Sequence, residues 1–290
     1  MSLPQGAYAP IPTPLGENGL FDPGALERHL DFLSKAGLDG ALVMGTNGEF
    51  PSFDLNERMA VADAAARFGK KLTLMLGVGS CALPEVHQLV RTAHHLGFSS
   101  VLVPPPFYFR SASTKGLIAF FADLLETSEL PVLLYHIPQV TGVPISDEIL
   151  DGVIDHPRFA GVKDSSGDEQ ELERFCSRLM DQSYMVGHDR LVTRARMAGG
   201  SGSITASASV VPGLVAATQR DADRQPELDR VRSLLESHGL GPAVKAVLRH
   251  KGIGAYRSRP PLVDLDPDSE RSLIREFEAI VAESTPSISS

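Results

Sequence analysis

A lysine ends an apolar segment of the sequence at a position where a turn residue is usual. The stretch FAGVKDSSGD, residues 159–168, carries Lys163 directly after its apolar residues. An ammonium group among apolar walls loses hydration, so we expect the pKa of Lys163 to fall below the usual value of about 10.4. A neutral amine of this kind attacks a carbonyl carbon and forms a Schiff base. The alternative is a lysine that ends a strand in solvent and pairs with Asp164.

A tyrosine ends the apolar segment that precedes this one. Residues 131–135 read PVLLY, which places Tyr135 last. If the two segments form neighbouring strands, about 4.8 Å apart, Tyr135 and Lys163 face one cavity. A phenol in that cavity can relay protons during carbonyl chemistry. A core tyrosine with a backbone-bonded hydroxyl is the alternative, and the nearby lysine favours the proton relay.

Two further segments carry candidate binding residues. GTNGE at 45–49 brackets Thr46 and Asn47 with glycines, and such a turn can direct backbone N–H groups at a carboxylate. A plain turn before a helix would look much the same. After the prolines at 104–106, Tyr108 would belong to a lid, a subunit contact or ordinary loop packing.

These residues stand at the ends of short apolar segments that alternate with longer amphipathic ones. Nearly continuous apolar strands are typical of a parallel sheet that is buried on both faces. The predicted strands cover residues 7–13, 40–44, 72–77, 100–103, 132–135, 159–163, 184–187 and 202–205. Eight strands with intervening helices predict an α/β fold, the (β/α)₈ TIM barrel, whose active sites lie at the C-terminal ends of the strands. A flavodoxin-like sheet, which needs five or six strands, is the alternative.

Helix start signals lie between these segments. Asp22 precedes a proline at the first helical position, and Asp54 and Glu57 form the pattern of a capping box. After Pro212 the strand pattern stops. The segments predicted to be helical beyond it are 227–238, 242–251 and 269–283. The predicted organisation is a barrel over 1–215, C-terminal helices packed on it over 216–283, and a disordered tail over 284–290.

Composition narrows the class of protein. The 290 residues carry a net charge of −9, which does not favour a nucleic-acid partner. Cys81 and Cys176 form neither a disulfide framework nor a zinc spacing, so we expect a reducing, cytoplasmic location. A signal-peptide pattern is missing, and no apolar stretch approaches the roughly 18 residues of a membrane span. The histidines show no HxH or HExxH motif, and residues 77–79 lack the third glycine of a dinucleotide fingerprint, so we predict neither a metal nor a cofactor.

Four motifs together resemble one family. GTNGE (45–49), LLYHIPQVTG (133–142), GVKDSSGD (161–168) and GGSGSIT (199–205) are similar to signatures of the pyruvate-dependent class I aldolases that include dihydrodipicolinate synthase and N-acetylneuraminate lyase. The motifs occur in the family's order, and the resemblance spans about residues 5–265. It implies a (β/α)₈ barrel with C-terminal helices, assembled as a homotetramer that is a dimer of dimers.

The resemblance also implies roles for individual residues. Lys163 would form a Schiff base with C2 of pyruvate or another 2-keto acid, and Tyr135 would relay protons. Thr46 and Asn47 would hold the pyruvyl carboxylate, and Thr46 would also complete the proton relay. The backbone carbonyl of Ile204 would face the site. The family's Tyr-Tyr pair reads Phe-Tyr here, which leaves open whether Tyr108 reaches a neighbouring subunit's site.

Departures from the family pattern bear on the substrate. In dihydrodipicolinate synthases an arginine of the strand-five motif holds the aldehyde substrate's distal carboxylate, and Val140 takes its place here. Losing such a contact costs on the order of 2–5 kcal/mol, which disfavours lysine biosynthesis. The stretches GTNGEFPS and VKDSSGD are most similar to 4-hydroxy-2-oxoglutarate aldolases. In that subgroup the residue matching Ser165 contacts the substrate.

A further departure lies at strand seven. The stretch at residues 187–190 reads GHDR. Sialic acid lyases carry a stretch similar to GYDE at this position, and its acidic groups bind the hydroxyls of the sugar. The resemblance keeps Gly187 among the substrate-binding residues, whereas Arg190 in place of an acid argues against a polyol. Our hypothesis is that Arg190 binds the distal substrate carboxylate that Val140 has no group to bind. An exposed arginine in the first turn of a helix is the alternative.

The predicted activity is reversible cleavage of a 4-hydroxy-2-keto acid, such as 4-hydroxy-2-oxoglutarate, to pyruvate and an aldehyde. The alternatives are a 2-keto-3-deoxy sugar acid aldolase or dehydratase and dihydrodipicolinate synthase itself. A metal-dependent class II aldolase is another. From a different class, a sensor that binds 2-keto acids without catalysis would keep the barrel, although an intact Lys163 and Tyr135 speak against it.

Overall fold

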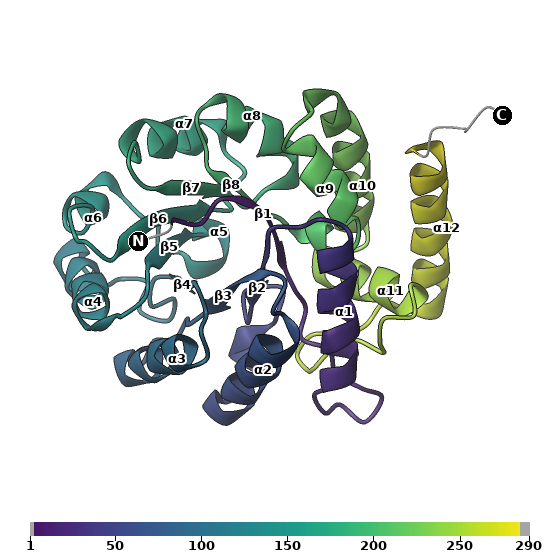
Figure 1. Ribbon diagram of the computed structural model, residues 1–290, viewed down its shortest axis with the longest axis horizontal. Helices are drawn as coiled ribbons and strands as arrows, with labels where there is room; N and C mark the ends of the chain where they lie inside the picture. Colours follow the sequence, from purple (N-terminus) through teal and green to yellow (C-terminus); the bar gives the residue numbers. More distant parts are fainter. Residues whose placement is uncertain (1–2, 285–290) are drawn as a thin grey trace.

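Eight parallel strands close into a barrel in chain order, and the last strand pairs with the first (Figure 1). The computed structural model describes residues 3–284. The strands are β1 Gly6–Pro10, β2 Gly40–Val43, β3 Thr73–Gly77, β4 Ser100–Val103, β5 Val132–His136, β6 Phe159–Asp164, β7 Ser183–Val186 and β8 Gly202–Ile204. The predicted TIM barrel is confirmed, and each predicted strand overlaps an observed one.

The strand interiors are apolar on both faces, as a barrel enclosed by helices requires. The inward side chains form a cluster that includes Leu42, Met75, Leu102, Leu133 and Met185. Strand β1 is shorter than predicted, because prolines interrupt residues 10–14 and a proline has no N–H for the hydrogen-bond ladder.

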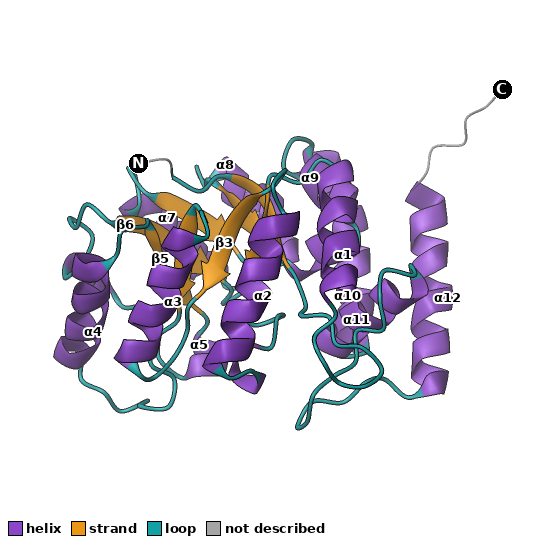
Figure 2. Ribbon diagram, turned by 60° about the horizontal axis from the view of Figure 1, so that its bottom comes forward, coloured by secondary structure: helices purple, strands orange, loops and turns teal. Residues whose placement is uncertain are grey.

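Helices surround the strands, as Figure 2 shows for α2, α3 and α4. The helices of the barrel are α1 Pro23–Lys35, α2 Leu55–Phe68, α3 Leu83–His95, α4 Thr114–Thr127, α5 Pro138–Thr141, α6 Asp147–Asp151, α7 Glu169–Arg178, α8 Val192–Met197 and α9 Pro212–Thr218. The capping box is present, since the Glu57 N–H donates to the Asp54 side chain at 2.9 Å and the Asp54 N–H to Glu57 at 3.0 Å. Asp22 caps α1 as predicted, accepting a hydrogen bond from the backbone of Ala25.

Three helices follow the barrel: α10 Gln225–Ser237, α11 Leu240–His250 and α12 Pro267–Ser284. They share a second apolar core that includes Val244, Val247 and Phe277, and in Figure 1 they lie beside α1 and α9. Helix α9 runs through residue 215, where we placed the boundary between the barrel and the C-terminal helices. Of the predicted tail, residues 285–290 lie outside the described part of the chain.

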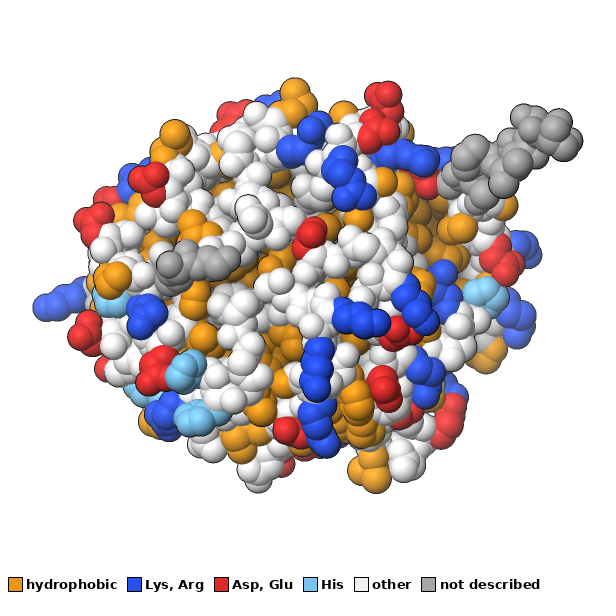
Figure 3. Space-filling model, viewed as in Figure 1, with side chains coloured by type: hydrophobic (Ala, Val, Ile, Leu, Met, Phe, Trp, Pro, Cys, Tyr) orange, Lys and Arg blue, Asp and Glu red, His pale blue; other side chains and the backbone are white. Residues whose placement is uncertain are grey.

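The surface carries charges of both signs. Figure 3 shows acidic and basic side chains interspersed over the face that Figure 1 turns to the viewer. Between residues 3 and 284, no helix combines the length and the apolar character needed to cross a bilayer.

Candidate active site

Lys163 and Tyr135 meet inside the C-terminal end of the barrel. Their Cα atoms are register partners on β6 and β5, and the Lys163 ammonium lies 4.2 Å from the centre of the Tyr135 ring. Both side chains are buried, with exposed fractions of 3% and 4%. The structure therefore brings the two residues together as the sequence analysis expected.

A local irregularity in β6 aims the lysine inward. Ala160 belongs to the interior cluster although it lies three residues before Lys163, and a regular strand would turn these two side chains to opposite faces. The register with β5 shifts by one residue at this point. Gly161 has a φ of +136°, and a Cβ atom there would lie 1.9 Å from the carbonyl oxygen of Ser183. Only glycine fits this bulge, which resets the alternation.

The neighbouring carboxylate is not the partner of the lysine. Asp164 accepts hydrogen bonds from the Tyr184 hydroxyl at 2.9 Å and from the Ser166 N–H at 2.9 Å. Within residues 3–284, no carboxylate forms an ion pair with Lys163. A buried lysine without a carboxylate partner is rare in a purely structural role. The alternative of a strand-ending Lys163–Asp164 ion pair is therefore wrong.

Two hydroxyl groups hold the Tyr135 phenol. Thr46 and Ser165 each donate a hydrogen bond to its oxygen, at 3.4 Å in both cases. Burial alone would raise the pKa of Tyr135, but the Lys163 charge and these two hydrogen bonds outweigh it, so this pKa is lowered from its ordinary value. A phenol that releases its proton more easily than usual suits a proton relay.

Glycine at position 187 makes room for Ser165. A Cβ atom on Gly187 would lie 1.9 Å from the Ser165 hydroxyl oxygen. The Gly187 N–H also donates to the carbonyl oxygen of Asp164 at 2.6 Å. Ile204, at the end of β8, is buried in the same interior cluster as Tyr135. These predicted residues are thus gathered at one end of the barrel.

The turn after β2 presents an unused hydrogen-bond donor. The side-chain nitrogen of Asn47 is buried and has no hydrogen-bond partner within the described chain. Buried polar groups are nearly always paired, so an orphaned amide N–H beside Thr46 is a candidate ligand donor. Thr13 stabilises the turn, because its hydroxyl donates a hydrogen bond to the Gly48 carbonyl oxygen at 2.7 Å.

The sequence analysis missed the residues that anchor this turn. Glu49 adopts a positive φ of 56° and forms a buried ion pair with Lys245 of α11. Arg259 donates to the Ser52 carbonyl oxygen at 2.8 Å. The only local signal was a lysine within the apolar stretch AVKAVL, which had been taken for a helix alone. The C-terminal segment therefore helps to position the turn after β2.

Two predicted residues lie apart from this group. The Arg190 guanidinium donates to Glu236 of α10 at 2.6 Å and to Ser233 at 3.1 Å. Tyr108 is 81% exposed, and its backbone N–H donates to the Cys81 sulfur at 3.4 Å. A role for Arg190 or Tyr108 in substrate binding stays a prediction.

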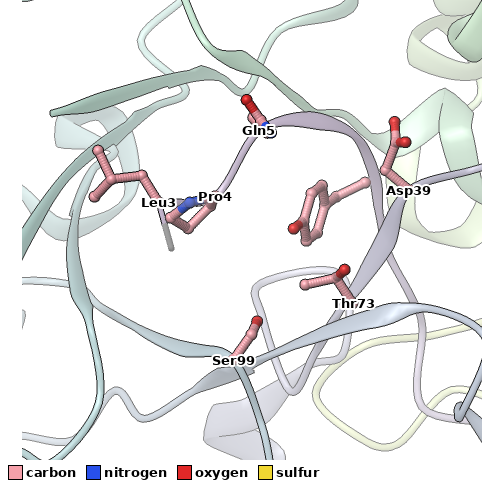
Figure 4. Close-up of a pocket in the computed structure, with 7 residues that line it drawn as sticks. Leu3, Pro4, Gln5, Asp39, Thr73 and Ser99 are labelled. Carbon is pink, nitrogen blue, oxygen red and sulfur yellow. The ribbon is translucent and has the colours of Figure 1, made fainter. Parts of the chain in front are cut away.

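Cavities lie at both ends of the barrel. One of about 90 Å³ adjoins Tyr135, and its lining residues are Thr46, Phe50, Pro51, Pro104, Phe107, Tyr135, Ile137, Val140 and Thr141. Another of about 230 Å³ lies at the N-terminal end, lined by Leu3, Pro4, Gln5, Tyr8, Asp39, Thr73 and Ser99 (Figure 4). Chemistry in this fold occurs at the C-terminal ends of the strands, so the cavity beside Tyr135 is the candidate active site. Among residues 3–284, no group of three or more His, Cys, Asp or Glu side chains is placed to hold a metal ion.

Comparison with known proteins agrees with this geometry. The model of the "Dihydrodipicolinate synthetase family" matches residues 3–280. An "Uncharacterized DapA-like lyase" of Chloroflexus aurantiacus is 35% identical over 299 aligned residues, which cover 99% of this chain and 100% of that protein. A "4-hydroxy-tetrahydrodipicolinate synthase" of Stenotrophomonas maltophilia is 31% identical, covering 91% of this chain and 92% of its own.

The fold agrees with a solved structure as well. The prophage protein YagE of E. coli K12, described as a member of the dihydrodipicolinic acid synthase family in complex with pyruvate, superposes with a TM-score of 0.91. Its sequence identity is 22%, over 97% of this chain and 99% of that chain.

Fold, site and relatives define a lyase of the class I, pyruvate-dependent aldolase type. The chain belongs to the dihydrodipicolinate synthetase family. The resemblance stated from the motifs is thereby confirmed at the level of the family. The nearer likeness to 4-hydroxy-2-oxoglutarate aldolases stays a prediction, because the 35% identical relative carries only the broader name of a DapA-like lyase.

Proposed function

We propose that the protein cleaves a 4-hydroxy-2-keto acid, such as 4-hydroxy-2-oxoglutarate, to pyruvate and an aldehyde through a Schiff base on Lys163. The observation that carries the proposal is a buried lysine without a carboxylate partner, 4.2 Å from the ring of a tyrosine that lines the cavity. The neutral amine of a lysine is the form that attacks a ketone.

The first half of the reaction builds the Schiff base. The Lys163 amine adds to C2 of the substrate, and the resulting carbinolamine loses water to give an iminium. Tyr135 is the group placed to move protons in this step, with Thr46 and Ser165 hydrogen-bonded to its oxygen. The unpaired Asn47 amide is the proposed donor to the substrate's C1 carboxylate.

The second half breaks the carbon–carbon bond. The iminium accepts the electron pair of the C3–C4 bond, so cleavage leaves a neutral enamine on Lys163 rather than a carbanion. Tyr135 in its phenolate form takes the proton of the C4 hydroxyl as the aldehyde leaves. Protonation of the enamine at C3 and hydrolysis then release pyruvate and return the free amine.

Trapping with borohydride tests the proposal. Incubation with pyruvate and borohydride is expected to add one reduced pyruvyl group, mapped to Lys163 by peptide mass spectrometry. Lys163→Arg keeps the positive charge and serves as the control, with no label expected. Labelling of another lysine, or none in the wild type, would remove the proposed mechanism and would favour a sensor that binds 2-keto acids without catalysis.

The synthase activity named for the Stenotrophomonas relative is the second candidate, supported by 31% sequence identity. It uses the same Schiff base but needs a group that holds a distal carboxylate, and Val140 offers none. Pyruvate release from 4-hydroxy-2-oxoglutarate, measured beside condensation of pyruvate with aspartate semialdehyde, separates the two activities.

We also propose the homotetramer that the family resemblance implied. Tyr108 and Phe109 are exposed and stack edge to face with ring centres 5.6 Å apart, which supports a contact with another subunit. Sedimentation of the wild type beside Tyr108→Ala tests this contact, and a monomeric wild type would exclude it.

A further inference from the structure

We propose that the aldehyde half of the substrate binds in the cavity beside Tyr135 and carries an apolar side chain, a branched aliphatic group or a single aromatic ring. This inference rests on the proposed Schiff-base cleavage and narrows its substrate class. In place of 4-hydroxy-2-oxoglutarate, whose tail is a carboxylate, it assigns a 4-hydroxy-2-keto acid whose tail is apolar. The cavity adjoins the residues proposed for catalysis, since Tyr135 and Thr46 line it. Any group attached to C4 of the substrate must lie close to the oxygen that takes the C4 hydroxyl proton.

The walls of this cavity are apolar on all the elements that form it. Phe50 and Pro51 come from the 3₁₀ turn η1, Phe50–Ser52, which follows the GTNGE turn. The loop after β4 contributes Phe107, whose ring meets that of Phe50 edge to face, with centres 6.0 Å apart. Val140 is one of three residues that the segment after β5 contributes. A pair of aromatic rings suits an apolar group better than a hydrated one.

The polar atoms of the lining are already used. Thr141 donates its hydroxyl to the Ile137 carbonyl oxygen at 3.1 Å and accepts from the Val143 N–H at 3.2 Å. Thr46 donates its hydroxyl to the Tyr135 oxygen, which also accepts from Ser165. A carboxylate or a chain of hydroxyls would lose its hydration in this cavity without gaining partners.

No charged residue of the described chain lines the cavity, and Arg58 and Arg190 have partners elsewhere. Arg58 stacks over the Phe50 ring at 5.2 Å, but its terminal nitrogens donate to the backbone oxygens of Gly79 and Gly77. Arg190 pairs with Glu236.

The competing possibility is an anionic substrate tail, and Arg110 is the arginine that would bind it. Arg110 runs along Gly142 at the end of α5, its Cδ atom 2.9 Å from the place of a Cβ on that glycine. Its guanidinium is exposed and forms no ion pair with any described residue. If the substrate tail were anionic and extended out of the cavity, Arg110 would be the cation within reach.

The size of the cavity limits how much of the substrate it can bury. A buried cavity of about 150 Å³ lined by Leu, Ile and Phe holds a benzene molecule, and this one measures about 90 Å³. A branched chain of a few carbons fits it, and an aromatic ring would extend partly out of it. A sugar-acid tail of several hydroxylated carbons exceeds it.

Aldol addition in the synthetic direction tests the inference. Pyruvate is combined with 2-methylpropanal, benzaldehyde, glyoxylate or glyceraldehyde, and kcat/KM is measured for each aldehyde. In this direction the enamine C3 bonds to the aldehyde carbon, and the aldehyde oxygen takes up a proton. We expect at least one apolar aldehyde to exceed both glyoxylate and glyceraldehyde about tenfold or more.

Variants separate the outcomes. Val140→Thr puts a hydroxyl into the wall at nearly constant volume and is expected to lower kcat/KM for the apolar aldehydes about fivefold to tenfold, leaving pyruvate trapping on Lys163 unchanged. Val263→Thr, at an exposed valine outside the cavity lining, is the matched control and should change neither. Arg110→Ala is expected to leave the order of the aldehydes as it is.

Three results would overturn the inference. A preference for glyoxylate that Arg110→Ala abolishes would show an anionic tail bound by Arg110. Schiff-base formation without addition to any of the four aldehydes would show that the cavity does not receive an aldehyde of this kind. If Lys163 is not labelled by pyruvate at all, the proposed function itself fails, and this inference fails with it.

Discussion

Two tyrosines inside the same barrel shift their pKa values in opposite directions. Tyr8 lies near the N-terminal end and Tyr135 near the C-terminal end, with exposed fractions of 2% and 4%. Burial raises the pKa of Tyr8, and a hydrogen bond with Thr73 offsets only part of that rise. Burial acts on Tyr135 in the same sense, but the adjacent Lys163 charge and its hydrogen bonds lower this pKa. Both side chains are buried, so their neighbouring groups account for the opposite directions of the two pKa shifts.

The cavities at the two ends differ in the same way. Polar residues of the N-terminal cavity already have partners: Asp39 accepts the Ala7 N–H at 2.8 Å, and Ser99 donates to the Leu74 carbonyl oxygen at 2.8 Å. Figure 4 shows both side chains at the rim of this cavity. At the C-terminal end, and among residues 3–284, Lys163 has no carboxylate partner and the Asn47 amide nitrogen has no hydrogen-bond partner. A buried lysine without a carboxylate partner in the described chain distinguishes the C-terminal end, although the other cavity is larger.

Replacing the lysine should have the largest effect. Lys163→Arg keeps a cation beside Tyr135 but has no neutral amine to attack a ketone, so kcat should fall by at least about 10³-fold. Steady-state release of pyruvate measures the loss. The far-UV circular dichroism spectrum should match that of the wild type, which shows that the barrel is intact. Retained turnover would mean that no covalent intermediate forms at this position.

Removing each tyrosine hydroxyl tests the comparison directly. Tyr135→Phe should lower kcat about 10²-fold to 10³-fold, the range of a lost general acid–base group. Tyr8→Phe removes the hydroxyl of another buried tyrosine, one without a cation beside it, and should leave kcat unchanged. Both variants are assayed with the same substrate at one pH. Similar losses in the two would show that a phenol acts here through packing and not through its proton.

The pKa of a buried histidine shows the effect of burial in the absence of a charged neighbour. His29 on α1 lies between the Tyr256 hydroxyl, 2.8 Å from its Nδ1, and the Ser209 carbonyl oxygen, 3.0 Å from its Nε2. Burial lowers the pKa of His29 to about 4, although the hydrogen bond to Ser209 opposes the change. The folded pKa lies below the usual 6.5, so the unfolded chain binds more protons between these two values.

The stability should therefore fall as the pH drops from 6.5 toward 4. A difference of about 2.5 pKa units corresponds to about 3 kcal/mol of unfolding free energy at the acid end. Urea unfolding at several pH values, for wild type and His29→Gln, measures it. The variant should lose this part of the pH dependence, whatever its stability at neutral pH. Parallel curves for the two proteins would contradict the assignment to His29.

Local patterns explain why the sequence analysis placed the lysine and the tyrosine. Lys163 and Tyr135 each end a continuous apolar strand, and strand periodicity and helix caps such as Asp54 depend on residues only a few positions apart. Eight such strands predict a parallel barrel, and residues at the C-terminal ends of its strands lie at the same end of the barrel. Lys163 and Tyr135 were therefore expected to lie together. Elements and their order are predictable because their signals are short-range.

Short-range sequence patterns did not predict the contacts between segments that are far apart in the chain. The bulge at Gly161 is required by the carbonyl of Ser183 on the next strand. The pairing of Arg190 depends on Glu236 of α10, and neither residue marks the other in the sequence. Glycines and charges acquire these roles only when packing brings their partners close.

The smallest effect concerns the orphaned amide. Asn47→Ala should raise KM for pyruvate in the addition reaction about tenfold and change kcat little, because one hydrogen bond to a charged group contributes about 1.5–3 kcal/mol. Ser99→Ala, at the N-terminal cavity, is the matched control and should leave KM as it is.

The two variants should also differ in stability. Ser99→Ala removes a hydroxyl that is hydrogen-bonded to Leu74, so its unfolding free energy should fall by about 1 kcal/mol. Asn47→Ala removes a buried donor that has no partner among residues 3–284, so the unfolding free energy should stay level or rise. Asn47→Ala would then weaken pyruvate binding without lowering the unfolding free energy. If Asn47→Ala loses stability as Ser99→Ala does, this amide is structural, and the contrast between the two ends of the barrel no longer includes it.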